Sequence, residues 1–176
     1  MPRARRKIFV LILFVLFAFP VFSQQGIQRE RCSRPEAKQL DFWLGNWALT
    51  WVDKEGHEMK GSNHISKDFG GCVVKEEFTD ANNKYAGMSV SVYDSVAGMW
   101  KQTWVDNDGA YLDFTGEMKN GMMSFHRTAW HNGKEILQRM RWDNVAQDSL
   151  DWIWERSEDN GKTWLVGWKI HYERKI

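Results

Sequence analysis

Proline is scarce in this 176-residue chain, which has three prolines and none after Pro35. Every later residue therefore keeps the backbone N–H that a β-ladder needs, and no strand has to be interrupted by proline. The absence permits a domain built from long strands. No shift in composition marks a linker or a second domain, and about 150 residues are enough for one domain with its own core.

An excess of one charge is also lacking. The first 23 residues hold four of the 24 Lys and Arg and none of the 23 Asp and Glu, which leaves the remainder with a net charge of −3. This balance gives no electrostatic reason to expect nucleic acid or an anionic membrane surface as a partner. We expect neither.

A long apolar run occurs at the N-terminus alone. Four basic residues within positions 3–7 precede apolar residues 8–22, and Val21 and Ser23 suit the positions before a cleavage. We predict a signal peptide over 1–23, a single domain over 24–176, and export to the periplasm or the medium. The alternative is an uncleaved anchor, which normally needs about 20 apolar residues. No Cys directly follows the cleavage point, which argues against a lipid anchor.

Cysteine is limited to Cys32 and Cys72. In an exported chain, two cysteines are most simply explained as one disulfide that leaves no odd thiol. It would join the N-terminal segment to the third strand. The alternatives, a thiol nucleophile or a metal-binding pair, lack C-x-x-C spacing and a nearby His.

Turn signals recur regularly along the chain. Asn-Gly, Asp-Gly and related pairs stand 11 to 15 residues apart and favour the positive φ angles of tight hairpins. Nine turns predict ten strands, the turns being at residues 55–56, 70–71, 82–83, 97–98, 108–109, 120–121, 132–133, 146–147 and 160–161. Before the strands, Ser33-x-x-Glu36 fits a capping box and predicts one helical turn.

The predicted strands alternate with a period of two, as half-buried strands do. In the last strand the predicted inner face comprises Trp164, Val166, Trp168, Ile170 and Tyr172. The same alternation in other strands turns inward Trp47, Leu49, Trp51, Met140, Trp142, Leu150, Trp152 and Trp154. An open sheet of ten strands would leave two unpaired edges, which closure removes.

We therefore predict an all-β fold, a closed antiparallel up-and-down barrel of about ten strands with a short N-terminal helix. Barrel diameter grows with strand number, and eight strands already leave room for one small ligand. A ten-stranded barrel should hold a cavity unless bulky side chains fill it. Eleven tryptophans make a filled lumen a serious alternative.

The segment D-F-W-L-G-N-W at residues 41–47 resembles the G-x-W opening of lipocalins and other calycins. In those proteins a short helical turn closes the barrel base, and the Trp caps it beside an Arg from the final strand. The resemblance implies that Arg174 stacks on Trp47 as a cation–π contact worth about 1 kcal/mol.

A closer resemblance covers nearly the whole mature chain. It rests on the order of D-F-W-L-G-x-W, Gly71-Cys72 with Glu76, Gly87-x-Ser89, Tyr93-Asp94, W-x-Q-x-W-V-D at 100–106, and S-x-D-x-G-x-T-W at 157–164. This order is similar to that of an exported bacterial family, domain-of-unknown-function family 1579. The resemblance implies a lipocalin-like barrel and export, and brings no established reaction. Asn46 stands where we expect an acidic residue in that family.

The last of these motifs, residues 157–164, is the Asp-box known from sialidase propellers. A propeller repeats it in each blade, whereas this chain has one copy, between the ninth and tenth predicted strands. A retaining sialidase also needs an arginine cluster and a Tyr nucleophile with its acid partner, and no such grouping is recognisable. We interpret the motif as a hairpin turn, with Asp159 capping N–H groups and Gly161 supplying positive φ.

Motifs for common catalytic or cofactor sites are missing. The chain lacks G-x-S-x-G, H-E-x-x-H, P-loop and G-x-G-x-x-G patterns, and its five histidines have no zinc-site spacing. One axial His can hold haem in a ten-stranded barrel, as in nitrobindins, and His171 lies in the corresponding region. Its parity places it outside, however. We predict no metal and no cofactor.

The candidate site combines inward aromatic and polar residues. Trp100, Gln102, Trp104 and Asp106 share a face of the fifth strand, which suits either an apolar pocket with a few polar groups or a packed core. Glu76, in an apolar interior, should pair with an arginine or have a raised pKa and act as an anchor or general acid. With His126 as an interior candidate, the predicted ligand-binding residues are Glu76, Trp100, Gln102, Trp104, His126, Trp142 and Trp154.

Three functions fit this pattern. We favour an extracytoplasmic protein that binds a small, largely apolar or aromatic molecule inside the barrel. The first alternative is a barrel enzyme, such as an isomerase, cyclase or hydrolase, with Glu76 or Asp106 as proton carrier. The second is a structural barrel with a filled core whose outer face binds another protein through Met99, Thr103 and Val105.

Overall fold

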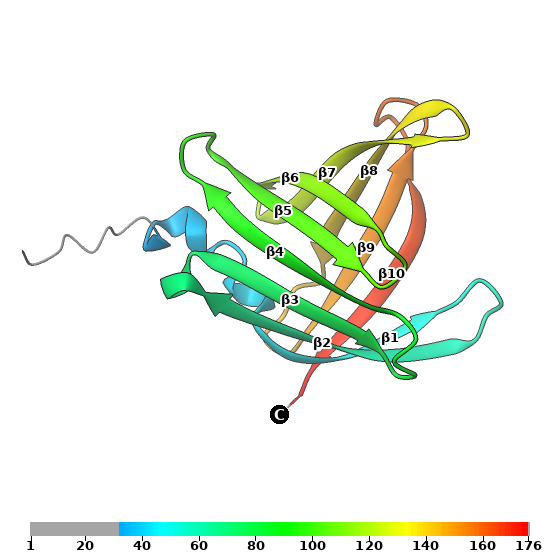
Figure 1. The fold of residues 1–176 in the computed structure, drawn as a ribbon, viewed down its shortest axis with the longest axis horizontal. Coiled ribbons are helices and arrows are strands. Elements are labelled where there is room, and N and C mark those ends of the chain that lie inside the picture. The colour runs from blue at the N-terminus through cyan, green and yellow to red at the C-terminus, as the bar shows by residue number, and fades with distance from the viewer. Residues whose placement is uncertain (1–31, 176) are drawn as a thin grey trace, which may run out of the picture.

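The computed structural model describes residues 32–175 of the chain, and the predicted signal peptide lies outside these residues. Strands make up most of the described part (Figure 1). The strands are β1 (Gly45–Val52), β2 (Glu58–Asp68), β3 (Val73–Asp80), β4 (Ala86–Asp94), β5 (Met99–Asp106), β6 (Tyr111–Lys119), β7 (Met122–His131), β8 (Lys134–Asp143), β9 (Ser149–Ser157) and β10 (Leu165–Arg174).

The ten strands close into one antiparallel barrel. Each strand pairs with its neighbours in sequence, and β1 also pairs with β10. The up-and-down barrel predicted from the turn spacing is therefore confirmed. The β1–β10 seam is short, running over four residue pairs from Trp47–Arg174 to Thr50–His171. Beyond it, the far end of the β1–β2 hairpin extends away from β10 (Figure 1).

Among residues 32–175, two short 3-10 helices precede β1, namely η2 (Pro35–Lys38) and η3 (Asp41–Trp43). Leu40 and Trp43 are fully buried among the core side chains, so this segment closes one end of the barrel. The predicted capping box is wrong, because the N-cap of η2 is Arg34 and no side chain caps it. Proline at the first helical position has no N–H that needs a partner.

The N-terminal segment is fixed to the barrel by the predicted disulfide. Cys32 and Cys72 are bonded, with their Cα atoms 4.9 Å apart. Cys72 follows a third 3-10 turn, η4 (Phe69–Gly71), and directly precedes β3. The link therefore joins the segment to the start of the third strand. Lys67 adds an ion pair with Asp41 on η3.

The closed end has the Trp–Arg arrangement that the lipocalin resemblance implies. The guanidinium of Arg174 lies 4.1 Å from the ring centroid of Trp47 and donates from Nη1 to the carbonyl of Leu44 at 2.7 Å. Trp47 is completely buried and donates from Nε1 to the carbonyl of Trp43 at 2.8 Å. One stacked pair thus connects η3, β1 and β10.

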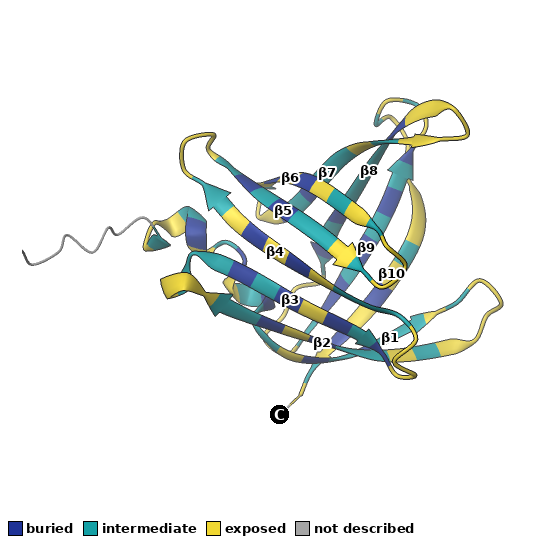
Figure 2. Ribbon diagram, viewed as in Figure 1, coloured by how far each residue is buried: buried dark blue, intermediate teal, exposed yellow. Residues whose placement is uncertain are grey.

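Buried and exposed positions alternate along the strands, as Figure 2 shows for β3 and β4. The predicted inner face of β10 is correct for Trp168, Ile170 and Tyr172 and wrong for Trp164 and Val166. A β-bulge between Val166 and Trp168 adds one residue and reverses the facing. Val166 is 59% exposed.

The predicted Asp-box hairpin is confirmed between β9 and β10. Asp159 accepts hydrogen bonds from the backbone N–H of Thr163 at 2.9 Å and from its hydroxyl at 2.6 Å. These donors hold the pKa of Asp159 at about 2. Gly161 has φ 84°, and Trp164 donates from Nε1 to its carbonyl at 3.1 Å. Trp164 packs outside, under the guanidinium of Arg139 at 3.9 Å.

Candidate functional site

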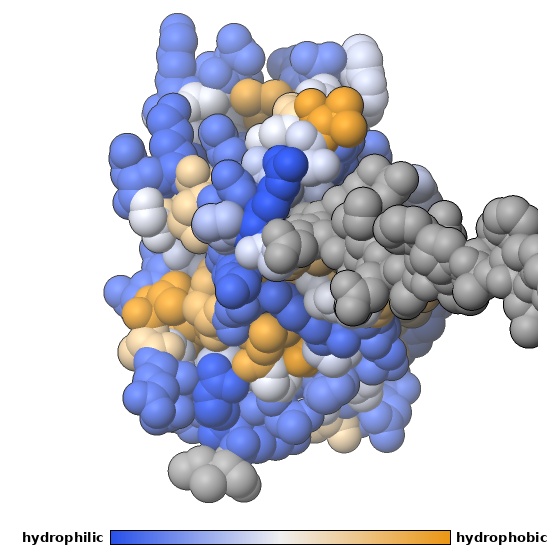
Figure 3. All heavy atoms as spheres, turned by 90° about the vertical axis from the view of Figure 1, so that its left-hand side faces the viewer, coloured by the Kyte–Doolittle hydropathy of each residue, from blue (hydrophilic) through white to orange (hydrophobic). Residues whose placement is uncertain are grey.

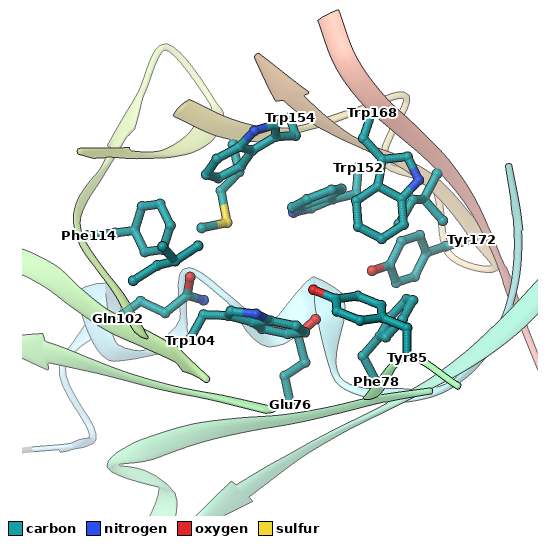
Figure 4. A pocket seen from close by; sticks show the side chains of 13 residues that line it. Glu76, Phe78, Tyr85, Gln102, Trp104, Phe114, Trp152, Trp154, Trp168 and Tyr172 are labelled. Atoms are coloured by element: carbon teal, nitrogen blue, oxygen red, sulfur yellow. The ribbon is translucent and has the colours of Figure 1, made fainter. Parts of the chain in front are cut away.

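The lumen is filled at the end closed by η2 and η3 and hollow farther along. Below the hollow, Trp142 packs edge-on against Trp43 and Phe125, with ring centroids 5.0 and 5.9 Å apart. The hollow has a volume of about 270 Å³, near the lower end of the roughly 300–1,000 Å³ of small-molecule sites. Thirteen residues line it: Glu76, Phe78, Tyr85, Gln102, Trp104, Leu112, Phe114, Met140, Trp152, Trp154, Trp168, Ile170 and Tyr172 (Figure 4).

Eight of the thirteen lining residues are aromatic. Trp152, Trp154 and Trp168, from β9 and β10, lie across the hollow from Tyr85 and Trp104 (Figure 4). Many of the rings contact one another edge to face. Trp152 and Trp154 are stacked, with centroids 6.3 Å apart and planes inclined by 19°. Such contacts add about 0.5–1.5 kcal/mol per pair beyond burial, so the wall is preformed.

Glu76 is the buried carboxylate of this wall. It accepts a hydrogen bond from Asn63 Nδ2 at 2.7 Å on one oxygen and from Ser89 Oγ at 2.6 Å on the other. Burial raises the pKa of Glu76 from its ordinary 4.5 to about 6, although both hydrogen bonds act to lower it. The ion pair between Glu76 and an arginine that the sequence suggested is wrong, since its partners Asn63 and Ser89 are neutral. The alternative, a pKa raised by burial, is correct.

Gln102 extends the polar strip along the wall. Its Nε2 donates to Ser91 Oγ at 2.9 Å and, more weakly, to Ser89 Oγ at 3.4 Å. Ser89 in turn donates to Glu76, and the other donor to Glu76, Asn63, also donates to Tyr172 Oη at 3.1 Å. A connected set of polar groups therefore runs along one side of an otherwise apolar cavity.

A second carboxylate, Asp106, binds two of the lining residues. Its Oδ2 accepts from Trp104 Nε1 at 2.9 Å and from Tyr85 Oη at 3.0 Å. Desolvation acts to raise the pKa of Asp106, but these bonds and two backbone N–H donors outweigh it and lower the pKa. Burial and Asp106 together raise the pKa of Tyr85, which stays neutral. Asp106 thus positions two rings.

The structure brings four of the seven predicted ligand-binding residues to the cavity, namely Glu76, Gln102, Trp104 and Trp154. Trp100 and Trp142 point inward as predicted, but lie in the packed end of the lumen and do not line the cavity. Trp100 donates from Nε1 to Gln39 Oε1 at 3.0 Å, which connects it to the N-terminal segment.

The interior placement of His126 is wrong. On β7 the buried residues are Met123 and Phe125, so the predicted facing of this strand is reversed. His126 lies half-buried on the outer wall, 2.9 Å from Ser124 Oγ. Burial lowers its pKa, and the neighbouring Arg139 lowers it further.

Parity places several further lining residues inside the barrel, but a period of two does not indicate height along the barrel axis and so does not separate the cavity from the packed end. Trp152, Trp168 and Tyr172 belong to this group. Asn63 carried no sequence signal, since a lone Asn in a strand is ordinary. Ser89 belonged to the Gly87-x-Ser89 motif of the family resemblance, which assigned it no role. Their importance comes from their contacts with Glu76.

The outer wall of β9 is unusually buried and charged. Glu155 accepts from Arg139 Nε at 2.6 Å and pairs with Arg141 Nε at 3.2 Å. Asp151 pairs with Lys169 at 3.0 Å and with His171 Nδ1 at 2.8 Å. His171 therefore faces outward, as predicted. Trp168, on the adjacent strand, lines both the lumen and an outer hollow of about 660 Å³ beside the β1–β10 seam.

One group of possible metal ligands occurs among residues 32–175, formed by Asp53, Glu55 and His57 in the β1–β2 turn. The carboxylate of Asp53 already accepts from the backbone N–H groups of Glu55 and His57, at 3.0 and 2.8 Å. The hydrogen bonds of the turn account for the cluster, and we assign no metal to it. No helix in the described part of the chain is long and apolar enough to span a bilayer.

Comparison with protein-family models finds no match, and comparison with curated proteins finds no relative above the significance threshold. The resemblance to domain-of-unknown-function family 1579 thus stays a prediction. Among solved structures, the chain is similar to EF1p2_mFAP2b bound to DFHBI, with 9% identity, a TM-score of 0.41, and coverage of 80% of this chain and 99% of that one.

Two further structures have similar coverage. One is a redesigned β-barrel, b11L5F_LGL, with 12% identity, a TM-score of 0.35, and coverage of 80% of this chain and 96% of the other. The second is a protein of unknown function of the DUF3598 family from Nostoc punctiforme, with 8% identity, a TM-score of 0.26, and coverage of 81% and 100%. A ten-stranded barrel fits a lipocalin-like fold.

Proposed function

We propose that this protein binds a small, largely apolar molecule with aromatic or flat character in the barrel lumen, outside the cytoplasm. The observation that carries the proposal is a preformed cavity of about 270 Å³ whose wall has eight aromatic side chains, with Glu76 and Gln102 as its polar groups. Ligand sites combine apolar walls with a few placed polar groups in this way. The disulfide and the predicted signal peptide support an oxidising compartment.

Neutral fluorescent probes test the proposal directly. We expect N-phenyl-1-naphthylamine or 1-aminoanthracene to quench tryptophan fluorescence in a saturable way, because Trp104, Trp152 and Trp154 line the cavity. Leu112→Trp should abolish this binding by filling the lumen. The matched control is Tyr111→Trp, since Tyr111 is the preceding residue and is 68% exposed. Equal probe binding by both variants would contradict binding in the lumen.

An enzyme is the second candidate function, and one observation favours it. Glu76 has a pKa of about 6 and lies in the cavity wall, which suits proton transfer near neutral pH. Asp106 gives no such support, because its pKa is lowered and its oxygens accept four hydrogen bonds. Hydrolysis of 1-naphthyl acetate that disappears in Glu76→Gln and persists in Glu77→Gln would favour this candidate over simple binding.

The protein-interaction candidate has weaker support. A cavity of about 270 Å³ argues against a completely filled lumen. On the outside, Met88 on β4 pairs with Val105 on β5, and both are a little over one third exposed. The face of the molecule shown in Figure 3 is mostly hydrophilic, with apolar side chains in small groups. Scattered groups of this kind are normal on soluble proteins.

A further inference from the structure

Two acidic side chains in this barrel are buried to a similar degree but have opposite surroundings. The side chain of Glu155, on the outer wall, is 5% exposed and pairs with both Arg139 and Arg141. Glu76, on the inner wall, is 8% exposed and takes part in none of the ion pairs formed by residues 32–175. A buried carboxylate without a cation is costly to keep ionised.

Among residues 32–175, the side chains that bond to Glu76 or interact with its charge are neutral. Asn63 approaches from β2, Ser89 from β4 and Tyr172 from β10. The pKa of Tyr172 is raised well above 10 by burial and by the charge of Glu76, so its hydroxyl keeps its proton. With a pKa of about 6, Glu76 is itself mostly ionised above neutral pH. The polar side of the cavity therefore has one uncompensated negative charge.

The rest of the wall also favours positive charge. The faces of Trp and Tyr rings attract cations by about 0.5–2 kcal/mol each, most strongly when water is excluded. Tyr85 and Trp104 are further polarised by the carboxylate of Asp106. In the described part of the chain, the cation beside this wall is Arg127, which is not one of the lining residues. Its guanidinium lies 5.7 Å from the centroid of Phe114 and donates from Nη1 to Gln138 Oε1 at 2.9 Å.

We infer that the ligand is an organic cation, a primary amine or quaternary ammonium compound with apolar or aromatic substituents. Glu76 is its counter-ion, and the indole and phenol rings surround its charged group. The positive charge lies on the Glu76 side of the cavity, and the apolar part extends between Trp104 and the stacked pair Trp152 and Trp154 (Figure 4). This inference rests on the proposed function, because it names the ligand class of the same cavity.

Three naphthalene compounds of similar shape distinguish the proposed binding in the lumen from the inferred preference for cations. Isothermal titration calorimetry near pH 8 would compare 1-naphthylmethylammonium, 1-naphthalenemethanol and 1-naphthoate. We expect the ammonium compound to bind about tenfold or more tightly than the alcohol, and the carboxylate most weakly. If the alcohol binds as well as the ammonium compound, the proposed function stands and the cation inference fails. If none of the three binds, both fail.

A matched pair of variants locates the charge. Glu76→Gln keeps the shape of the side chain and removes its charge, whereas Glu77→Gln removes the charge of the next residue, which is half exposed and paired with Lys75 on the outside. Glu76→Gln should reduce affinity for the ammonium compound about tenfold, a clearly larger loss than for the alcohol. Glu77→Gln should change neither. Circular dichroism of both variants checks that they fold.

A permanently charged probe provides an independent readout. The affinity of (1-naphthylmethyl)trimethylammonium should rise several-fold from about pH 5 to about pH 8 in the wild type, as Glu76 ionises through its pKa of about 6. The Glu76→Gln variant should show no such rise. A rise of equal size in the variant, or a flat profile in the wild type, would overturn the assignment of Glu76 as counter-ion.

Discussion

Asn63 and Glu76 form a buried hydrogen bond of 2.7 Å between β2 and β3, from Nδ2 to Oε1. The same amide group reaches Tyr172 on β10, so one side chain holds a wall carboxylate and a wall phenol in fixed positions. The arrangement satisfies part of the hydrogen-bonding capacity of Glu76 but supplies no positive charge. Because Glu76 is buried and has hydrogen-bond donors but no cationic partner among residues 32–175, its pKa is raised. The effect of pH on stability and the proposed preference for a cationic ligand both follow from this.

The first prediction concerns stability and pH. The folded pKa of Glu76, about 6, exceeds its ordinary value of 4.5, so the folded state binds the proton more tightly than the unfolded state. The contribution of protonated Glu76 to the unfolding free energy is present in full below about pH 4.5. It is lost as the pH rises through about 6, a change of about 2 kcal/mol. Urea unfolding should show wild type losing about 2 kcal/mol relative to Glu76→Gln between about pH 4.5 and 7.5.

The comparison with Glu76→Gln is needed because other carboxylates act in the opposite direction. Asp151 and Glu155 have lowered pKa values, because hydrogen bonds and cationic partners outweigh their desolvation, and they add stability as pH rises. These contributions cancel in the difference between two proteins that share them. A difference independent of pH would show that Glu76 titrates normally.

The second prediction uses two glycines that face inward at different heights of the barrel. A Cβ atom at Gly87 would collide with the indole of Trp104 in the cavity wall, whereas one at Gly116 would come 2.6 Å from Phe125 in the packed end. Both Gly87→Ala and Gly116→Ala should cost about 1–3 kcal/mol in unfolding free energy. Only Gly87→Ala should change probe affinity, by displacing a ring that lines the site.

Fluorescence titration with N-phenyl-1-naphthylamine measures that difference. The two variants introduce the same methyl group and act on similar aromatic neighbours, which makes each the control for the other. Equal affinity changes in both would indicate that the cavity responds to global loosening of the barrel. No change in either would place the probe somewhere other than beside Trp104.

The sequence predicts the barrel well because its signals are local. Asn-Gly and Asp-Gly pairs set hairpins one at a time, and positive φ angles at Asn120, Gly121, Asn132 and Gly133 show how directly they act. The disulfide and the Trp47–Arg174 stack could also be predicted, the first from the residue count and the second from a resemblance. Both join residues far apart in the sequence, but residue type alone indicates the two partners.

The site is predicted less well, because it depends on the position of each residue along the barrel axis and on β-bulges that reverse which way a residue faces. The two-residue period predicts that Trp100 points inward. It does not predict that Trp100 lies in the packed end and donates a hydrogen bond to Gln39. The bulge beside Gly167 reverses the facing of Val166 without any change in the pattern of residue types. For Glu76, sequence parity gives a buried carboxylate, but the choice between an arginine and neutral donors requires the register of β2 against β3.

The third prediction concerns Arg174 at the closed end. Its guanidinium stacks on Trp47 and donates to the carbonyls of Leu44 and Gln147, at 2.7 and 3.0 Å. A lysine cannot reproduce a planar stack with two directed donors, so Arg174→Lys should lower the unfolding free energy by about 2 kcal/mol. Arg156→Lys is the control, because Arg156 forms an exposed pair with Glu158 and should cost about 0.5 kcal/mol or less. Equal costs in urea unfolding would contradict a structural role for the stack.

The last prediction concerns the disulfide, which closes a chain segment of 40 residues between Cys32 and Cys72. Constraining a loop of that length in the unfolded chain stabilises the folded state by about 4 kcal/mol on the chain-entropy model. The double variant Cys32→Ser, Cys72→Ser should lose that amount in urea unfolding, and adding a reductant should lower the wild type to the same level. Probe affinity measured well below the unfolding transition should stay within about twofold, because neither cysteine lines the cavity. If stability were unchanged by reduction, the N-terminal segment would be held by its other contacts, such as the Lys67–Asp41 ion pair, and the disulfide would add little to the barrel.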